Sequence, residues 1–176
     1  MIDLNELKLV AENHPVLLSE QKDFNFENPQ CDPIELAQRL HQCMVRSDGL
    51  GLSACQVGLP IKVFVIRTEE DKPFALFNPK IISESENLIS MKEGCLSFPL
   101  LYMNVKRPDF VRLRYQNEKG ETNTERFIGM TARVVLHEFD HMNGVLFLEK
   151  VSRMEKDRSL RKRAILKRKV KKIAKK

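Results

Sequence analysis

The chain has 176 residues, of which 42% are hydrophobic and 31% are charged. This length suits one domain with a hydrophobic core, and the composition excludes an intrinsically disordered chain. The longest strongly apolar run, VFVI at 63–66, is too short to cross a bilayer, so we expect no membrane association. Residues 1–15 lack the basic lead and apolar core of a secretory signal, so we expect a cytoplasmic protein.

Positive charge is concentrated at the C-terminal end of the chain. Residues 150–176 contain 14 lysines and arginines against Glu155 and Asp157, which gives a local charge of +12. Because the whole chain carries +6, the remaining residues sum to −6. The charge pattern therefore indicates a mildly acidic main domain at 1–150 and a basic extension at 151–176.

The first predicted element is a helix with both ends marked. Asp32 can cap it, Pro33 suits its first position, Glu35 completes a capping-box pattern, and Gly49 follows its end. Helical spacing predicts one buried face, formed by Ile34, Ala37, Leu40, His41 and Met44. We therefore expect His41 to be a packed or a surface residue and not a metal ligand.

The middle of the chain is typical of strands. Apolar and alternating patterns predict four of them, at 61–67, 74–79, 110–116 and 121–129. A helix is predicted next at 130–142, then a strand at 145–148 and a basic helix at 152–172. This order predicts an α+β fold with mostly antiparallel sheets around a central helix, flanked by an N-terminal and a basic C-terminal helix.

The predicted helix at 130–142 carries a His-Glu-x-x-His motif. Residues four apart lie on the same helical face, so His137 and His141 can direct their imidazoles at one metal ion. Glu138, next to the first histidine, can take a proton from a water activated by that metal. A solvated helix with this pattern by coincidence is the alternative, because the pentapeptide alone is only moderately specific.

The third ligand is not fixed by this motif. One large protease group has a histidine where this chain has Phe147, so that version is excluded. Glu149 or Glu155 could supply a carboxylate, although Glu155 lies in the strongly basic segment. Upstream, Cys95 in EGCLS is the better choice, since a thiolate and two imidazoles with an open position make a catalytic site. The other three cysteines are expected to be core residues, namely Cys31, Cys43 and Cys55.

A third segment, GLGLSACQ at 49–56, has glycines that permit close backbone approach and a Gln that can donate to an oxyanion. Together with EGCLS at 93–97 and LHEFDHMNG at 136–144, it resembles the peptide deformylase family. That family carries G-x-G-L-A-A-x-Q, E-G-C-L-S and Q-H-E-x-D-H-x-x-G in this order. Two positions depart from the pattern: Ser53 replaces an alanine, and Leu136 replaces a glutamine.

The resemblance implies a hydrolase that removes the N-formyl group from the initiator methionine of nascent polypeptides and releases formate. It implies that Cys95, His137 and His141 bind one Fe²⁺, for which Zn²⁺, Ni²⁺ or Co²⁺ can substitute. The ligand chemistry alone favours zinc. Glu138 would be the general base, and the Gln56 amide and the Leu96 backbone N–H would stabilise the oxyanion.

By the same resemblance, five residues are expected to contact the substrate: Leu50, Gly51, Met91, Gly94 and Tyr102. Part of the helix at 130–137 is expected to contribute to the methionine pocket. An ordinary core role remains open for the apolar members, and Tyr102 stands where some relatives have an arginine. Glu93 and Arg107 are expected to be structural partners.

The basic extension has two interpretations, a solvated helix or a site for a polyanion. Since the implied substrate emerges from a ribosome, ribosomal RNA is the natural polyanion, and we expect a monomeric enzyme. Two other functions remain open for the whole chain. In an ordinary zinc endopeptidase, Cys95→Ser would leave the metal content unchanged. In a nucleic-acid-binding protein with a structural metal, Glu138→Ala would leave all activity intact.

Overall fold

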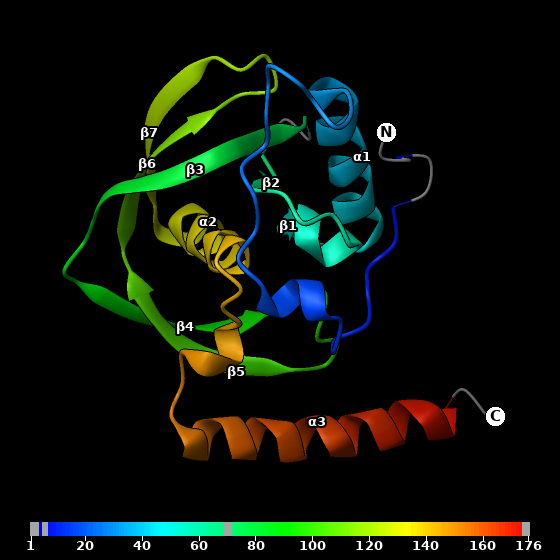
Figure 1. Ribbon diagram of the computed structural model, residues 1–176. Helices are drawn as coiled ribbons and strands as arrows, with labels where there is room; N and C mark the ends of the chain where they lie inside the picture. Colours follow the sequence, from blue (N-terminus) through cyan, green and yellow to red (C-terminus); the bar gives the residue numbers. More distant parts are fainter. Residues whose placement is uncertain (1–3, 5–6, 69–71, 174–176) are drawn as a thin grey trace.

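The computed structural model describes Leu4, residues 7–68 and residues 72–173. In this part of the chain a five-stranded antiparallel sheet has the order β1-β2-β3-β6-β7, and β4 and β5 form a separate antiparallel pair (Figure 1). The strands are β1 (Gly51–Ser53), β2 (Val63–Ile66), β3 (Phe74–Glu84), β4 (Leu88–Gly94), β5 (Tyr102–Pro108), β6 (Phe110–Gln116) and β7 (Thr122–Ile128). The predicted α+β fold with antiparallel sheets is confirmed.

The five-stranded sheet separates two hydrophobic cores. Val63 and Val65 of β2 pack in the core with α1 (Pro33–Arg46), whereas Phe64 and Ile66 pack in the core with α2 (Gly129–Met142). Side chains alternate between the faces of a strand, so this continuous apolar run is buried on both sides. The second core also includes residues of β5, and α2 therefore lies between the large sheet and the β4–β5 pair (Figure 1).

The start of α1 agrees with the prediction, but its buried face differs. The Asp32 carboxylate accepts hydrogen bonds from two backbone N–H groups of the first turn, and Pro33 is the first helical residue. Ile34 was expected in the core and is 47% exposed, whereas Leu36 is fully buried. These two residues are about 200° apart around a helix, so they cannot face the same core. His41 is buried, so the packed alternative is the one observed.

The segment at 145–148 was predicted as a strand, and this prediction is wrong. The chain instead forms a short 3-10 helix, η3 (Phe147–Glu149), and the described residues also include η1 (Pro15–Leu18) and η2 (Ala54–Val57). Leu146 and Phe147 are buried in the core beside α2. A short apolar run indicates burial but does not distinguish a strand from a turn.

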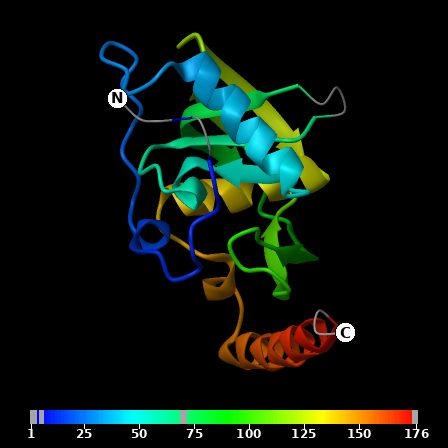
Figure 2. The same ribbon diagram turned by 90° about the vertical axis from the view of Figure 1, so that its right-hand side faces the viewer.

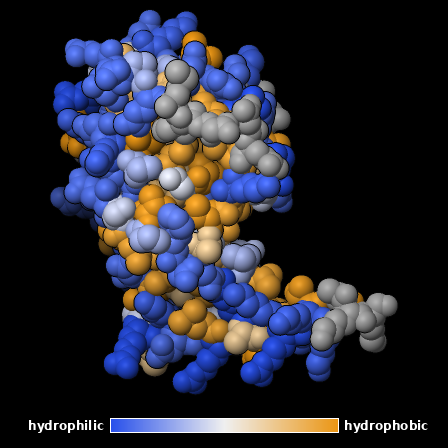
Figure 3. Space-filling model, turned by 45° about the vertical axis from the view of Figure 1, so that its right-hand side comes forward, coloured by the Kyte–Doolittle hydropathy of each residue, from blue (hydrophilic) through white to orange (hydrophobic). Residues whose placement is uncertain are grey.

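The basic C-terminal helix, α3 (Arg153–Ile173), confirms the prediction and lies below β5 in the view of Figure 1, at one end of the molecule (Figures 1 and 2). Only Ser159 and Arg163 are buried among its described residues. Hydrophilic side chains cover most of its outer surface in Figure 3. Across the described residues, no helix has both the length and the apolar character needed to span a bilayer.

Candidate metal centre and active site

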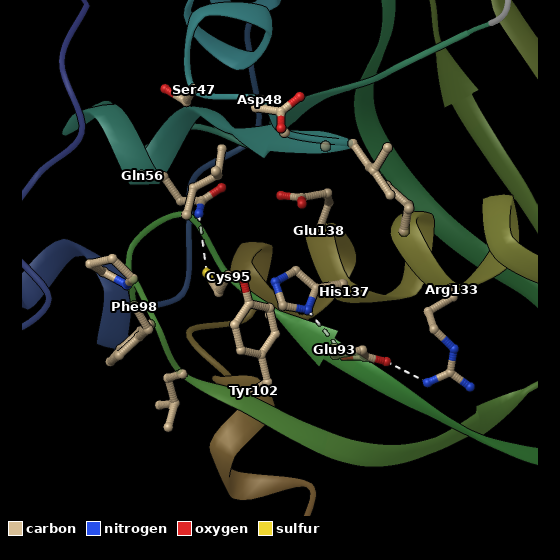
Figure 4. Close-up of a pocket in the computed structure, with 18 of the residues that line it drawn as sticks. Ser47, Asp48, Gln56, Glu93, Cys95, Phe98, Tyr102, Arg133, His137 and Glu138 are labelled. Atoms are coloured by element: carbon tan, nitrogen blue, oxygen red, sulfur yellow. Dashed lines mark hydrogen bonds and ion pairs between the residues drawn. The ribbon is translucent and has the colours of Figure 1, made fainter. Parts of the chain in front are cut away.

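The helix α2 brings the His-Glu-x-x-His residues to a cavity of about 600 Å³ (Figure 4). His137 and Glu138 line this cavity, and His141 is buried one turn further along the helix. Nε2 of His141 lies 3.4 Å from Sγ of Cys95, which follows β4. The ligand atoms of Cys95, His137 and His141 all lie within 4.8 Å of one another. The fold therefore assembles the three residues expected to bind metal.

The electrostatics of these residues fit a bound cation. Burial and the neighbouring His137 lower the pKa of His141, which favours the neutral imidazole that metals require. Burial also lowers the pKa of His137, but hydrogen bonding with Cys95 and Glu93 outweighs it and raises the pKa to about 10. The cysteine and carboxylate groups that favour a proton on His137 would also favour a metal ion beside it, because both are positive. Thiolate and imidazole are suitable ligands for a divalent transition metal.

Glu93 orients His137 from the side of the imidazole that faces away from Cys95. Its carboxylate lies 3.2 Å from Nδ1 of His137, so the opposite ring nitrogen faces Cys95 and the cavity. Arg107 donates to Glu93 at 2.7 and 2.9 Å and to Asp140 at 2.7 Å, and Arg133 also pairs with Glu93. Burial raises the pKa of Glu93, but the hydrogen bonds from His137 and Arg107 lower it to about 2. The prediction that Glu93 and Arg107 are structural partners is confirmed.

Glu138 is a buried carboxylate that points toward β1 (Figure 4). The Ser53 hydroxyl donates to its Oε2 at 2.6 Å. On the other side, a Cβ atom on Gly51 would lie 2.6 Å from its Oε1, so only glycine leaves room for the observed carboxylate. Burial raises the pKa of Glu138, which makes it a better proton acceptor than an exposed glutamate.

Gln56 is fixed on η2 with its amide directed at the metal-binding residues. Its Oε1 accepts a hydrogen bond from the Ser53 N–H at 2.9 Å. Its Nε2 donates to Sγ of Cys95 at 3.3 Å and to the Ser97 hydroxyl at 3.1 Å. The side chain is 1% exposed, so it is a positioned donor and not ordinary polar surface. Leu96 lies between these partners and lines the cavity.

Four of the five predicted substrate contacts line the cavity: Leu50, Gly51, Gly94 and Tyr102. Met91 is not among the lining residues and lies on β4 opposite Val105. Met130 and Val134 line the cavity from α2, within the part of the helix expected to do so. Gly94 allows the ring of Tyr102 to approach, since a Cβ there would lie 2.7 Å from that ring.

One wall of the cavity was not predicted from the sequence. It is the loop between β4 and β5, which contributes Phe98, Pro99, Leu100 and Leu101. Its apolar letters follow EGCLS directly, so their nearness to Cys95 was the available signal. Arg133 and Asp140 were also missed. Nothing in the sequence indicates that Arg133 pairs with Glu93 or that Asp140 pairs with Arg107.

Two helix-borne histidines, a cysteine and a buried glutamate facing one cavity define a metal-dependent hydrolase on an α+β fold. The sequence model of one family, polypeptide deformylase, matches residues 6–157. The chain therefore belongs to the peptide deformylase family. The resemblance of the three sequence blocks is thereby confirmed, and the endopeptidase and nucleic-acid-binding alternatives lose their support.

Individual relatives agree with this assignment. A peptide deformylase of Pseudothermotoga lettingae is 42% identical over 135 residues, which are 77% of this chain and 77% of the relative. One of Caulobacter vibrioides is 45% identical over 125 residues, 69% of this chain and 72% of the relative. Among solved structures, a peptide deformylase from Synechococcus elongatus in complex with actinonin has a TM-score of 0.83 at 33% identity. That match covers 93% of this chain and 90% of the other.

Proposed function

We propose that the removal of the N-formyl group from nascent polypeptides, the activity of this family, occurs in the cavity beside α2. The observation that carries this proposal is the cluster of Cys95, His137 and His141, whose ligand atoms lie within 4.8 Å of one another. Glu138 and the amide of Gln56 face the same cavity. A hydrolytic reaction needs a metal, a base and an oxyanion donor together, and these residues can provide all three functions.

The proposed metal is one Fe²⁺ held by Cys95, His137 and His141, with Zn²⁺, Ni²⁺ or Co²⁺ as possible substitutes. A sulfur and two nitrogen ligands suit each of these ions. When bound, the ion would supply Lewis-acid activation of water and of the formyl oxygen. The contact of Glu93 with His137 supports this role, because such a carboxylate fixes the orientation of a ligating imidazole.

Glu138 is the proposed general base and general acid. Its carboxylate accepts a proton from the water that attacks the formyl carbon, and it then donates that proton to the leaving amine as the C–N bond breaks. The products are formate and a peptide with a free N-terminal amine. The raised pKa of Glu138 supports both steps, since a carboxylate that binds a proton more readily can take it from water and keep it until the amine leaves.

Gln56 and Leu96 are the proposed donors to the oxyanion. The Gln56 amide donates to the Cys95 sulfur at 3.3 Å, so it points toward the proposed metal ligands, beside which the formyl group would bind. The backbone N–H of Leu96 is the second donor. Preorganised donors of this kind are typically worth about 10²–10³ in rate each.

The substrate is proposed to contact Leu50, Gly51, Gly94 and Tyr102, with its methionine side chain against Met130 and Val134. Met91 is omitted from this set because it does not line the cavity. Formyl is the smallest acyl group, so a narrow site beside Glu138 admits it and excludes an internal peptide bond. Gly51 supports this selectivity, because the backbone there lies directly against the carboxylate.

The test is the release of free amine from an N-formyl-methionyl tripeptide by anaerobically prepared, iron-loaded protein. We expect activity in the unmodified protein and a loss of about 10²–10⁴-fold in Glu138→Ala with an unchanged metal content. Cys95→Ser should lose metal as well as activity. Iron-loaded protein without deformylase activity would refute the proposal, and so would a Glu138→Ala variant of normal activity.

We propose in addition that α3 attaches the enzyme to ribosomal RNA. The supporting observation is that its lysines and arginines are exposed along almost the whole helix, as an extension of the catalytic domain at 1–150. Binding of this kind weakens steeply with salt, because it releases counterions. Salt-sensitive pelleting with ribosomes should be lost on deletion of 152–176, and binding that survives the deletion would contradict the proposal. We propose that the enzyme is a monomer and that it acts in the cytoplasm, where ribosomes are found.

A further inference from the structure

Arg163 differs from the other described basic residues of α3. It is 7% exposed, and it shares the inward face of the helix with Ser159, one turn earlier. A guanidinium withdrawn from water requires hydrogen-bond partners, because burying an unpaired charge is costly. The partners of Arg163 therefore indicate what this helix does for the rest of the molecule.

Arg163 joins α3 to two distant segments. Its Nε donates to the backbone carbonyl of Pro99 at 2.9 Å, and a terminal nitrogen forms an ion pair with the Glu12 carboxylate. Lys167, one turn further on, lies 3.9 Å from the same carboxylate. A planar guanidinium presents its donors to two acceptors in fixed directions, whereas the three donors of an ammonium group rotate and fix no such geometry.

The Pro99 carbonyl belongs to the loop that forms one wall of the cavity. The next residue, Leu100, has a φ of 65°, in the left-handed region that non-glycine residues adopt at a cost. The Pro99–Leu100 peptide plane connects that torsion to the carbonyl. A donor that fixes the carbonyl therefore also holds Leu100 in its conformation. The turn is closed by the Leu101 N–H, which donates to the Phe98 carbonyl at 3.1 Å.

We propose that Arg163 is a positioning residue for deformylation, which holds the 98–101 wall of the cavity in its substrate-binding shape from outside the site. The proposal rests on the proposed function, since it assumes that this cavity binds the formylated peptide. Arg163 lies beyond residue 157, where the match to the family ends. The basic extension is therefore part of the support of the active site and not only an attachment to other molecules.

The first test compares steady-state kinetics of Arg163→Ala and Arg163→Lys on an N-formyl-methionyl tripeptide. We expect KM to rise about tenfold in Arg163→Ala, with kcat and metal content within about twofold of the unmodified protein. Arg163→Lys should recover only part of the change. Arg161→Ala and Arg168→Ala are matched controls, because both arginines are exposed on the same helix, and they should leave KM unchanged. A loss of folded enzyme would lower the apparent kcat and not raise KM.

The second test measures amide hydrogen exchange in the same variants. Exchange at Leu101 should accelerate in Arg163→Ala and stay unchanged in the two controls, because the turn loses its anchor. If Arg163→Ala does not fold, Glu12→Gln removes the charge of one partner and should give a smaller rise in KM with the same exchange pattern. Unchanged KM and unchanged exchange would overturn the proposal. If the unmodified protein had no deformylase activity, the proposed function would fail, while the exchange experiment would still report whether Arg163 orders the loop.

Discussion

The helices α2 and α3 handle charge in opposite ways. In α2, Arg133, His137 and Glu138 are buried, and each has a specific partner at a fixed distance. In α3, almost every lysine and arginine is exposed, and Arg163 is the only buried charge among the described residues. The buried, paired charges of α2 hold side chains at fixed positions, which a chemical reaction requires. The exposed charges of α3 create a positive electrostatic potential around the helix, which would attract a polyanion.

This difference predicts how strongly each helix responds to substitution. A buried charge that loses its partner keeps its full desolvation cost, so small changes around α2 should have large effects. An exposed charge remains hydrated when its neighbour changes, so most changes on α3 should have small ones.

The largest effect is expected for Gly51→Ala. The added methyl group would lie 2.6 Å from Oε1 of Glu138 and 2.8 Å from Cγ1 of Val134, so the carboxylate has to move. We expect kcat to fall by about 10²–10³-fold, which is a large part of what a general base contributes. Steady-state kinetics at constant metal content measures it. A variant with normal kcat would mean that the Glu138 carboxylate can move without loss of activity, which would contradict the fixed side-chain positions that we infer for α2.

The buried ion network consists of Glu93, Arg107, Arg133 and Asp140, and Glu93→Gln should be the most destabilising change in it. It removes the charge that Arg107 and Arg133 share, and leaves two buried guanidinium groups without their full partner. Breaking a buried pair in this way costs about 3–5 kcal/mol. Urea denaturation gives the free energy of unfolding, and neutralising Glu155 on the exposed helix is the control. Equal losses in the two variants would remove the distinction between the helices.

Ser53→Ala should shift the pH dependence of the reaction. Burial raises the pKa of Glu138, and the hydrogen bond from Ser53 opposes that rise. Without the hydroxyl the pKa of Glu138 rises further, so the base is protonated at a higher pH. The acidic limb of the kcat/KM profile should therefore move to higher pH. A limb that moves to lower pH would contradict the donor role of Ser53.

The smallest effect is expected for Leu166→Ala on α3. Leu166 is 42% exposed, so its truncation should change the free energy of unfolding by no more than about 0.5 kcal/mol. The same substitution at Leu136 on α2, where the side chain is 5% exposed, should cost about 2–5 kcal/mol. Thermal or urea unfolding of both variants compares the two helices with one chemical change. A large loss at Leu166 would indicate a partner for that face of α3.

The residues proposed to perform the chemistry were largely predictable from the sequence, because three local motifs contain them. The clustering of Cys95 with His137 and His141 agrees with the expected ligand set. The pairing of Glu93 with Arg107 was also expected. Fold class and the helices at 130–142 and 152–172 followed from helical spacing and charge, which are local properties.

What could not be predicted depends on contacts between distant segments. β4 was missed because six of its seven residues are not buried, so the strand lacks an alternating apolar pattern. β5 does alternate between exposed and buried residues, but one of its buried residues is the charged Arg107, which hides the apolar pattern. Ser53 was noticed only as a departure from the family pattern, yet its hydroxyl donates to Glu138, 85 positions away in the sequence. Met91 has an apolar side chain beside EGCLS, but β-sheet register decides whether it faces the cavity.

The ion network behind His137 has a consequence for temperature. Glu93 lies on β4, Arg107 on β5, and Arg133 and Asp140 on α2, so charge pairs tie the hairpin to the helix. The cost of dehydrating charged groups falls on warming, whereas apolar burial per unit area reaches a plateau. The attachment of the hairpin to the helix therefore strengthens, relative to the surrounding core, as the protein warms.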